Sequence, residues 1–236
     1  MAARPAHHPA AHELIHLLLA TSDLPPLMAA LAHRTHVRLA PLGRYQCGIV
    51  LQRRNQPTLT AASNEAFEAS LQERLTRKDP HLGAVFGGPA SSHAHPAPED
   101  WGAQDGHGLL VVPAPAGRDA RGAVAVVGEV PTRPAGRREL LAAIGRLRNE
   151  TSWALHLAVR YAAERERAEN RAKAMLNRTV IDMAIGVIMA RSQCSTKEAF
   201  DALKRASNNR NVKLRDVAAE IVQHVHPSPP QTVFAD

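Results

Sequence analysis

Residues 176–225 read LNRTVIDMAIGVIMARSQCSTKEAFDALKRASNNRNVKLRDVAAEIVQHV, and this stretch decides the fold of the C-terminal part of the chain. Five apolar residues in it follow one another at alternating spacings of four and three: Leu176, Val180, Met183, Val187 and Ala190. This is the spacing of a helical seam, which can pack on neighbouring helices or on a second chain. The pattern predicts a helix that ends near residues 191–192.

A capping box opens the next predicted helix at Ser195. The Ser195 hydroxyl can accept a hydrogen bond from the Glu198 amide, and the Glu198 carboxylate can accept one from the Ser195 amide. The helix is expected to stop at residues 208–209 and to bury four apolar residues: Ala199, Phe200, Leu203 and Ala206. A third helix, ending at residues 226–227, has apolar residues at helical spacing: Leu214, Val217, Ala218, Ile221, Val222 and Val225. Three amphipathic helices predict a small bundle.

Positive charge is concentrated in the same region. The chain of 236 residues has a formal net charge of +7 and a pI near 10.1, which favours an acidic partner. Between residues 171 and 226 there are ten Lys and Arg against five Asp and Glu. Lys213 and Arg215 open the third helix, where free backbone amides also favour anions. The charge distribution therefore points to a polyanion as partner of the bundle.

In order and spacing, these motifs resemble the ANTAR domain. The resemblance covers residues 171–226 and rests on RTVIDMAIGVIMAR at 178–191, CS at 194–195, EAF at 198–200, Leu203 with RAS at 205–207, and NVKLRDVA at 211–218. Met183 departs from the pattern, in which a polar residue is expected. ANTAR proteins bind RNA and act as transcription antiterminators. The resemblance thus implies binding to paired hairpin loops of nascent RNA, which keeps a terminator from forming.

The RNA-binding candidates are basic residues outside the predicted core: Arg178, Lys204, Arg205, Arg210, Lys213 and Arg215. Contacts of these side chains with phosphates would make binding strongly dependent on salt. Phe200 is the only Phe, Tyr or Trp between residues 171 and 226, and its predicted place in the core argues against an aromatic platform for stacking bases. Base recognition would then depend on Arg and polar side chains.

Residues 12–163 alternate helical and β-rich segments. Helices are predicted at three places, the first two separated by Pro25 and Pro26: residues 12–20, 27–31 and 63–78. Strands are predicted at four places: residues 46–52, 57–62, 108–112 and 122–127. Residues 87–108 have the composition of a loop, and nothing breaks a long helix after Pro134. The order predicts an α+β fold, in which helices flank an antiparallel sheet and a long helix connects it to the C-terminal three-helix bundle.

This order of elements resembles the GAF domain, a small-molecule sensing module of bacterial regulators, with CGIV at 47–50 and GAVAV at 122–126 in its central strands. The resemblance implies a domain that senses a small-molecule or protein signal. Four residues are candidates for the wall of its pocket: Tyr45, Cys47, Phe86 and Trp101. Cys47, inside a strand, is expected to be a small core residue rather than a redox-active thiol.

The predicted division has five parts: a flexible N-terminus at 1–11, the GAF-like sensor at 12–163, a helical linker at 164–170, the ANTAR domain at 171–226 and a flexible tail at 227–236. The long helix is expected to join a homodimer through a partial seam, interrupted at Thr151, that comprises Leu140, Ile144, Leu147, Ala154 and Tyr161. No apolar run approaches the roughly 20 residues of a membrane span, and no secretory pattern is present. With two isolated cysteines, the chain is expected to be cytoplasmic.

Two other functions compete with this interpretation. HELIH at 12–16 matches the H-E-x-x-H signature of zinc proteases, but an amphipathic surface helix explains the same letters. His93, His95 and His107 lie in the long loop, where they could bind a metal or an effector. No nucleophile and base can be paired, so neither an enzyme activity nor a cofactor or metal is expected. A helix-turn-helix regulator that binds duplex DNA is the main alternative.

Overall fold

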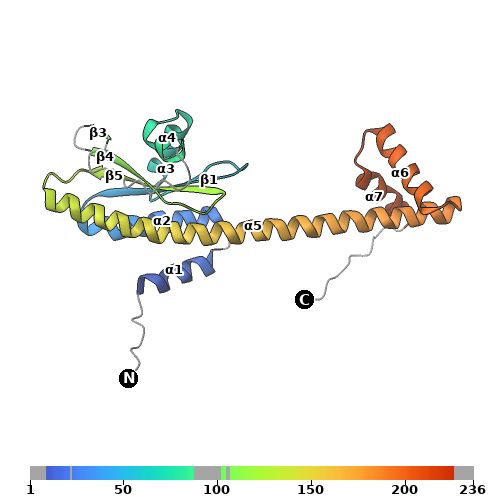
Figure 1. Cartoon of the computed structure of the whole chain (residues 1–236), viewed down its shortest axis with the longest axis horizontal. Coiled ribbons are helices and arrows are strands. Elements are labelled where there is room, and N and C mark those ends of the chain that lie inside the picture. The colour runs from blue at the N-terminus through green and yellow to red at the C-terminus, as the bar shows by residue number, and fades with distance from the viewer. Residues whose placement is uncertain (1–8, 22, 88–101, 105–106, 226–236) are drawn as a thin grey trace, which may run out of the picture. The chain divides into compact units, whose positions relative to one another are not determined.

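A computed structural model of the chain describes residues 9–21, 23–87, 102–104 and 107–225 (Figure 1). The chain divides after Ala163 into two compact units, which are described separately. Helix α5 (Pro134–Ser192) is a single helix of 59 residues with its ends in different units. This confirms the prediction that nothing breaks the helix that follows Pro134.

The N-terminal unit is built on a five-stranded antiparallel sheet in the order β2-β1-β5-β4-β3. Its strands are β1 (Tyr45–Arg53), β2 (Leu59–Ala62), β3 (Gly102–Gln104), β4 (His107–Pro113) and β5 (Ala120–Glu129). The two central strands pair along their whole length, from Tyr45 opposite Gly128 to Arg53 opposite Ala120. The predicted antiparallel sheet is thereby confirmed.

Both faces of the sheet are covered by helices, with α2 and the first part of α5 on one side and α3 and α4 on the other (Figure 1). Because neighbouring residues of a strand point to opposite faces, β1 supplies both layers. Cys47 and Ile49 pack toward α2 and α5, whereas Val50 packs with Phe67 and Leu71 of α3. Burial on both faces explains why β1 and β5 are apolar without alternation.

The helices of this unit are α1 (Pro9–Ala20), α2 (Leu24–Leu39), the 3₁₀ turn η1 (Ala40–Leu42), α3 (Glu65–Thr76) and α4 (Pro80–Gly87). Asn64 caps α3, and its side chain accepts a hydrogen bond from the Phe67 amide at 2.8 Å. The prediction for α2 was too short, because Pro25 and Pro26 begin this helix instead of preceding it. Prolines fit the first helical turn, where the backbone amides have no intrahelical acceptor.

The long loop predicted at residues 87–108 needs correction at its end. Residues 102–104 form the edge strand β3, which pairs with the beginning of β4. A run of Gly, Ala and Gln carries no β signal of its own, so its pairing with β4 determines the strand. Residues 88–101 and 105–106 lie outside the described residues.

The part of α5 in the N-terminal unit packs against the sheet. Leu140, Ile144 and Leu147 are buried in the cluster that contains Cys47, and Ala154 is buried with α2. Thr151, expected to interrupt a seam, is buried as well. The prediction that these residues form a dimer seam is therefore wrong, because they are the core of their own chain. Tyr161, the last residue of that seam, is exposed.

In the C-terminal unit, α6 (Thr196–Arg210) and α7 (Leu214–Val225) pack with the last part of α5. Seven buried residues form its core: Ala184, Ile185, Ala199, Leu203, Val217, Ala218 and Val222. The capping box of Ser195 and Glu198 is present, with the Ser195 amide donating to the Glu198 carboxylate at 2.9 Å. Helix α6 stops at Arg210, slightly later than predicted, where Asn211 adopts a left-handed conformation with φ 50°. The predicted three-helix bundle is confirmed.

Across the described ranges, no helix is both long enough and apolar enough to cross a membrane.

Candidate nucleic-acid interface

Phe200 lies at the surface of α6 instead of in the core, and the prediction that it is buried is wrong. Its side chain is 39% exposed, whereas Ala199 and Leu203 on either side of it are fully buried. Successive residues of a helix are about 100° apart, so a small bundle buries only a narrow stripe of α6. Ala199 and Leu203 occupy that stripe, and Phe200 lies outside it.

Three basic or aromatic side chains and one amide follow the exposed side of α6 at spacings of three or four residues. We call this set the α6 patch: Lys197, Phe200, Lys204 and Asn208. Residues at these spacings share one face of a helix. Arg205, next to Lys204, is exposed beside the patch. Neither Lys204 nor Arg205 forms an ion pair with any residue in the described ranges, so both cations are available to a partner.

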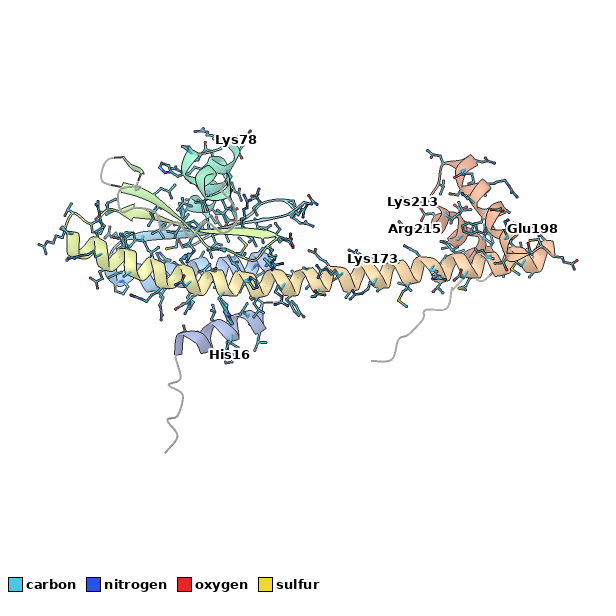
Figure 2. All side chains as sticks on the ribbon, viewed as in Figure 1. His16, Lys78, Lys173, Glu198, Lys213 and Arg215 are labelled. Carbon is cyan, nitrogen blue, oxygen red and sulfur yellow. The ribbon has the colours of Figure 1, made fainter. Side chains whose placement is uncertain are left out.

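Lys213 and Arg215 lie together at the start of α7, as Figure 2 shows, while Glu198 lies at the start of α6. The Lys213 carbonyl accepts hydrogen bonds from the amides of Asp216 and Val217 at 2.9 and 3.2 Å. Lys213 thus caps α7 through its backbone, and its exposed side chain is left to contact a ligand. Arg215 contacts the neighbouring Asp216 carboxylate at 3.2 Å. The turn at residues 211–213 brings this end of α7 next to the end of α6.

Arg210 has a structural partner within the bundle. Its guanidinium donates two hydrogen bonds to the Glu220 carboxylate, at 2.6 and 3.0 Å, and thereby ties α6 to α7. These hydrogen bonds lower the pKa of Glu220 and raise the pKa of Arg210. Of the six predicted RNA-binding residues, Arg210 therefore has the most strongly compensated charge.

Arg178 projects from α5, well exposed, at 3.8 Å from the carboxylate of Asp182 one turn later. Such an exposed pair is weak and screened by salt, so it leaves the Arg178 charge largely available. Lys204 and Arg205 thus lie on α6, Lys213 and Arg215 at the start of α7, and Arg178 on α5, and all five side chains are exposed. Lys197 and Phe200 lie on the same side of α6 as Lys204 and were not among the predicted RNA-binding residues. The step of three from Lys197 to Phe200 and the step of four from Phe200 to Lys204 are the signal in the sequence that could have found them.

Of the four candidates for the sensor pocket, the three that the structure describes do not come together. Tyr45 and Cys47 are buried in the cluster on the α5 side of the sheet, where burial raises the pKa of Cys47 to about 12. Burial, together with the charge of Glu129, also raises the pKa of Tyr45. Phe86 packs on the opposite side of the sheet. Trp101 lies outside the described residues.

Phe86 lines a cavity of about 400 Å³ on the α3 and α4 side of the sheet. The other side chains that line it include Gln52, Thr58, Leu75, Lys78 and Leu82. Lys78, labelled in Figure 2, follows α3 in a left-handed conformation with φ 55°. This cavity, rather than the surroundings of Cys47, is the open space next to a predicted pocket residue.

The H-E-x-x-H segment lies on α1, where Glu13 pairs with Arg34 at 3.5 Å. The His12 side chain is outside the described residues, as are His93, His95 and the side chain of His107. Among the side chains that the structure does describe, no three His, Cys, Asp or Glu gather as metal ligands. Glu13 is thus part of an ion pair between α1 and α2.

Comparison with known families matches the C-terminal helices. A family model described as "ANTAR domain" matches residues 169–222, which span the last part of α5, α6 and nearly all of α7. The match begins two residues before the predicted boundary at 171. No GAF match was detected in the N-terminal unit. No curated protein matches the chain. The ANTAR prediction is confirmed for residues 169–222.

Proposed function

We propose that this protein is an RNA-binding regulator of transcription antitermination, in which the C-terminal bundle binds hairpin loops and the N-terminal unit senses a signal. The match to the ANTAR domain at residues 169–222 carries the proposal. The exposed α6 patch and its neighbouring cations supply the positive charges and the aromatic ring that the proposed RNA binding requires.

The surface suits a loop of unpaired nucleotides better than a regular duplex. Lys204, Arg205 and Lys213 contact phosphates, which gives affinity and its dependence on salt. Phe200 lies between Lys197 and Lys204, and its ring offers a flat apolar face on which an unpaired base can stack. Bases in a duplex are already stacked on one another, whereas those in a hairpin loop are free for this contact.

A protein that binds the loop of a hairpin stabilises that hairpin by mass action. Where the bound hairpin shares nucleotides with a terminator, its stabilisation keeps the terminator from forming. The ANTAR resemblance implies this outcome and a target of two paired hairpins. No chemical step is required of the protein.

The test of this function is a mobility-shift titration of the full chain with three ligands: a transcript carrying paired hairpins, an unstructured RNA of equal length, and a DNA duplex. We expect the hairpin transcript to bind most tightly at low and at high salt. Equal affinity for the unstructured RNA would refute loop recognition. Tighter binding to the duplex would establish the helix-turn-helix alternative instead.

Replacing Phe200 by Ala is expected to weaken hairpin binding by about tenfold, because stacking of one base on an aromatic ring contributes about 1–3 kcal/mol. Mobility-shift titration measures the change. The matched control is Val225→Ala, which truncates another exposed apolar residue of the bundle, 48% exposed at the end of α7. The control is expected to bind like the wild type. Equal affinities of the two variants would remove Phe200 from the interface.

The proposed sensor role of the N-terminal unit is supported by its element order and by its cavity. A five-stranded antiparallel sheet between helical layers is the arrangement that the GAF resemblance implies. The cavity beside Phe86 has the size of a small-molecule site. A signal bound in this unit changes RNA binding only if it binds the active and inactive states with different affinities.

We infer that the protein acts as a homodimer, through an apolar stripe that shares Tyr161 alone with the predicted seam. Trp153, Leu157 and Tyr161 follow α5 at steps of four residues and are 51%, 44% and 64% exposed. Ile15 and Leu19 are exposed on α1. Leu19, Leu157 and Tyr161 border a groove of about 330 Å³ between α1, α2 and α5. We call these five exposed residues the α1–α5 stripe. A second copy of this surface is its proposed occupant, because two RNA-binding bundles match a paired-hairpin target.

A further inference from the structure

A second cavity of about 400 Å³ lies at one end of the sheet, where the β1–β2 turn meets the start of β5. Four arginines and one carboxylate line it: Arg53, Arg54, Arg118, Arg121 and Asp119. The amide side chains of Gln52, Asn55 and Gln56 also line it. We call this cavity the arginine cavity. It belongs to the N-terminal unit and shares no residue with the α6 patch.

The backbone fixes the place of these residues. Gln52 is opposite Arg121 in the pairing of β1 with β5, and Arg53 is opposite Ala120. Beyond the paired residues, the Arg54 amide donates a hydrogen bond to the Asp119 carbonyl at 3.0 Å. The Gln56 amide closes the turn by donating to the Arg53 carbonyl at 3.3 Å. Two segments far apart in the sequence are thereby locked around one cavity.

Within the part of the chain that the structure describes, the charges of Arg54, Arg118 and Arg121 are poorly compensated. Arg54 and Asp119 are 3.9 Å apart and both side chains are well exposed, so their attraction is weak. Arg121 donates a hydrogen bond to the Phe86 carbonyl, which orients its guanidinium without neutralising it. Arg118 forms no ion pair with any residue that the structure describes. Among the described residues, Arg54, Arg118 and Arg121 thus bring three positive charges to the cavity against the carboxylate of Asp119.

We propose that the arginine cavity binds a phosphorylated small molecule. The planar guanidinium group matches the oxygens of a phosphate in a bidentate contact, and a concave surface concentrates the positive field. The cavity is larger than one phosphate needs, and Gln52, Asn55 and Gln56 line the space where the rest of the ligand would lie. That this ligand is the signal of the N-terminal unit rests on the proposed sensor function. The binding of the ligand to the arginine cavity does not rest on that function.

Isothermal titration calorimetry on the full chain tests the proposal with inorganic pyrophosphate and adenosine 5′-monophosphate as probes. The test variant is R54A/R118A, and the matched control is R133A/R138A, which removes two exposed arginines elsewhere in the unit. We expect the wild type and the control to bind at least one probe alike. The test variant is expected to bind it at least about tenfold more weakly, since it loses charge-assisted hydrogen bonds.

Two outcomes would overturn the proposal: no binding of either probe by the wild type, or an equal loss of binding in the control. If the wild type binds neither probe and R54A/R118A also loses hairpin RNA binding, the arginine cavity is assigned to RNA. The same variants in the mobility-shift titration separate this proposal from the proposed function. If the wild type binds pyrophosphate but no hairpin RNA, the proposal of a phosphate site in the arginine cavity is supported and the proposed RNA-binding function is refuted.

Discussion

Reversing the charges of Lys204 and Lys213 together is expected to lower the affinity for hairpin RNA by about a hundredfold or more, because two phosphate contacts become repulsions. Lys204 belongs to the α6 patch and Lys213 to the start of α7, so the double variant K204E/K213E acts on both sides of the turn at residues 211–213. Titrations with hairpin RNA at several salt concentrations measure this loss of affinity. The slope of log K against log salt should become shallower by about 0.7 for each lost contact with a single strand.

The bundle itself should survive this change. Both lysine side chains are exposed, and neither forms an ion pair with a residue in the described ranges. The core around Ala184 and Leu203 is untouched, as is the pair of Arg210 with Glu220. Thermal unfolding followed by circular dichroism is expected to match the wild type within a few degrees. A large drop in melting temperature would mean that the loss of affinity reports unfolding instead.

The control for charge alone is R44E/R138E, which changes the net charge equally through two exposed arginines of the N-terminal unit. We expect it to retain hairpin affinity within a few-fold. If K204E/K213E and R44E/R138E lose affinity equally, the RNA responds to the total charge of the protein, and the assignment of the interface to α6 and α7 is wrong.

Replacing Leu157 by Glu is expected to convert the proposed homodimer into a monomer. Leu157 is the middle residue of the three that the α1–α5 stripe takes from α5, so a dimer through this surface would bury a carboxylate without a partner. Burying an unpaired charge costs several kcal/mol, which is comparable to the free energy of a typical dimer contact. Sedimentation equilibrium of the full chain measures the change in mass.

Val37→Glu is the matched control, because Val37 is 53% exposed on α2 and is not part of the stripe. We expect this variant to remain a dimer. A wild type that is monomeric at tens of micromolar, or an L157E variant that remains dimeric, would contradict the assignment. A monomer should still bind one hairpin but lose the gain in affinity that two linked sites give for paired hairpins.

The boundaries of the C-terminal helices were predictable because local chemistry sets them. The capping box of Ser195 and Glu198 needs only residues three apart, and the start of α6 follows from it. The exposure of Phe200 was not predictable in the same way. Ala199 and Phe200 are adjacent, and the sequence does not tell which of the two falls on the narrow buried stripe of a three-helix bundle. Packing in three dimensions decides that.

The seam of α5 shows the same limit on a larger scale. Leu140, Ile144 and Leu147 have a spacing that fits a partner helix as well as a sheet, and the sheet of their own chain covers them. The periodicity predicts the helix and its apolar face, but it does not predict which surface packs against that face. The arginine cavity could not be predicted at all, since Arg54 and Arg118 meet only through the pairing of β1 with β5.

The burial of Cys47 has a practical consequence. Its thiol lies in the core, and its raised pKa, about 12, leaves almost no thiolate at neutral pH. Cys194, the other cysteine of the chain, is half-buried just before Ser195. A maleimide dye is therefore expected to label Cys194 in preference to Cys47. Attached there, a fluorophore would report on the helices of the ANTAR match without any cysteine having to be engineered out.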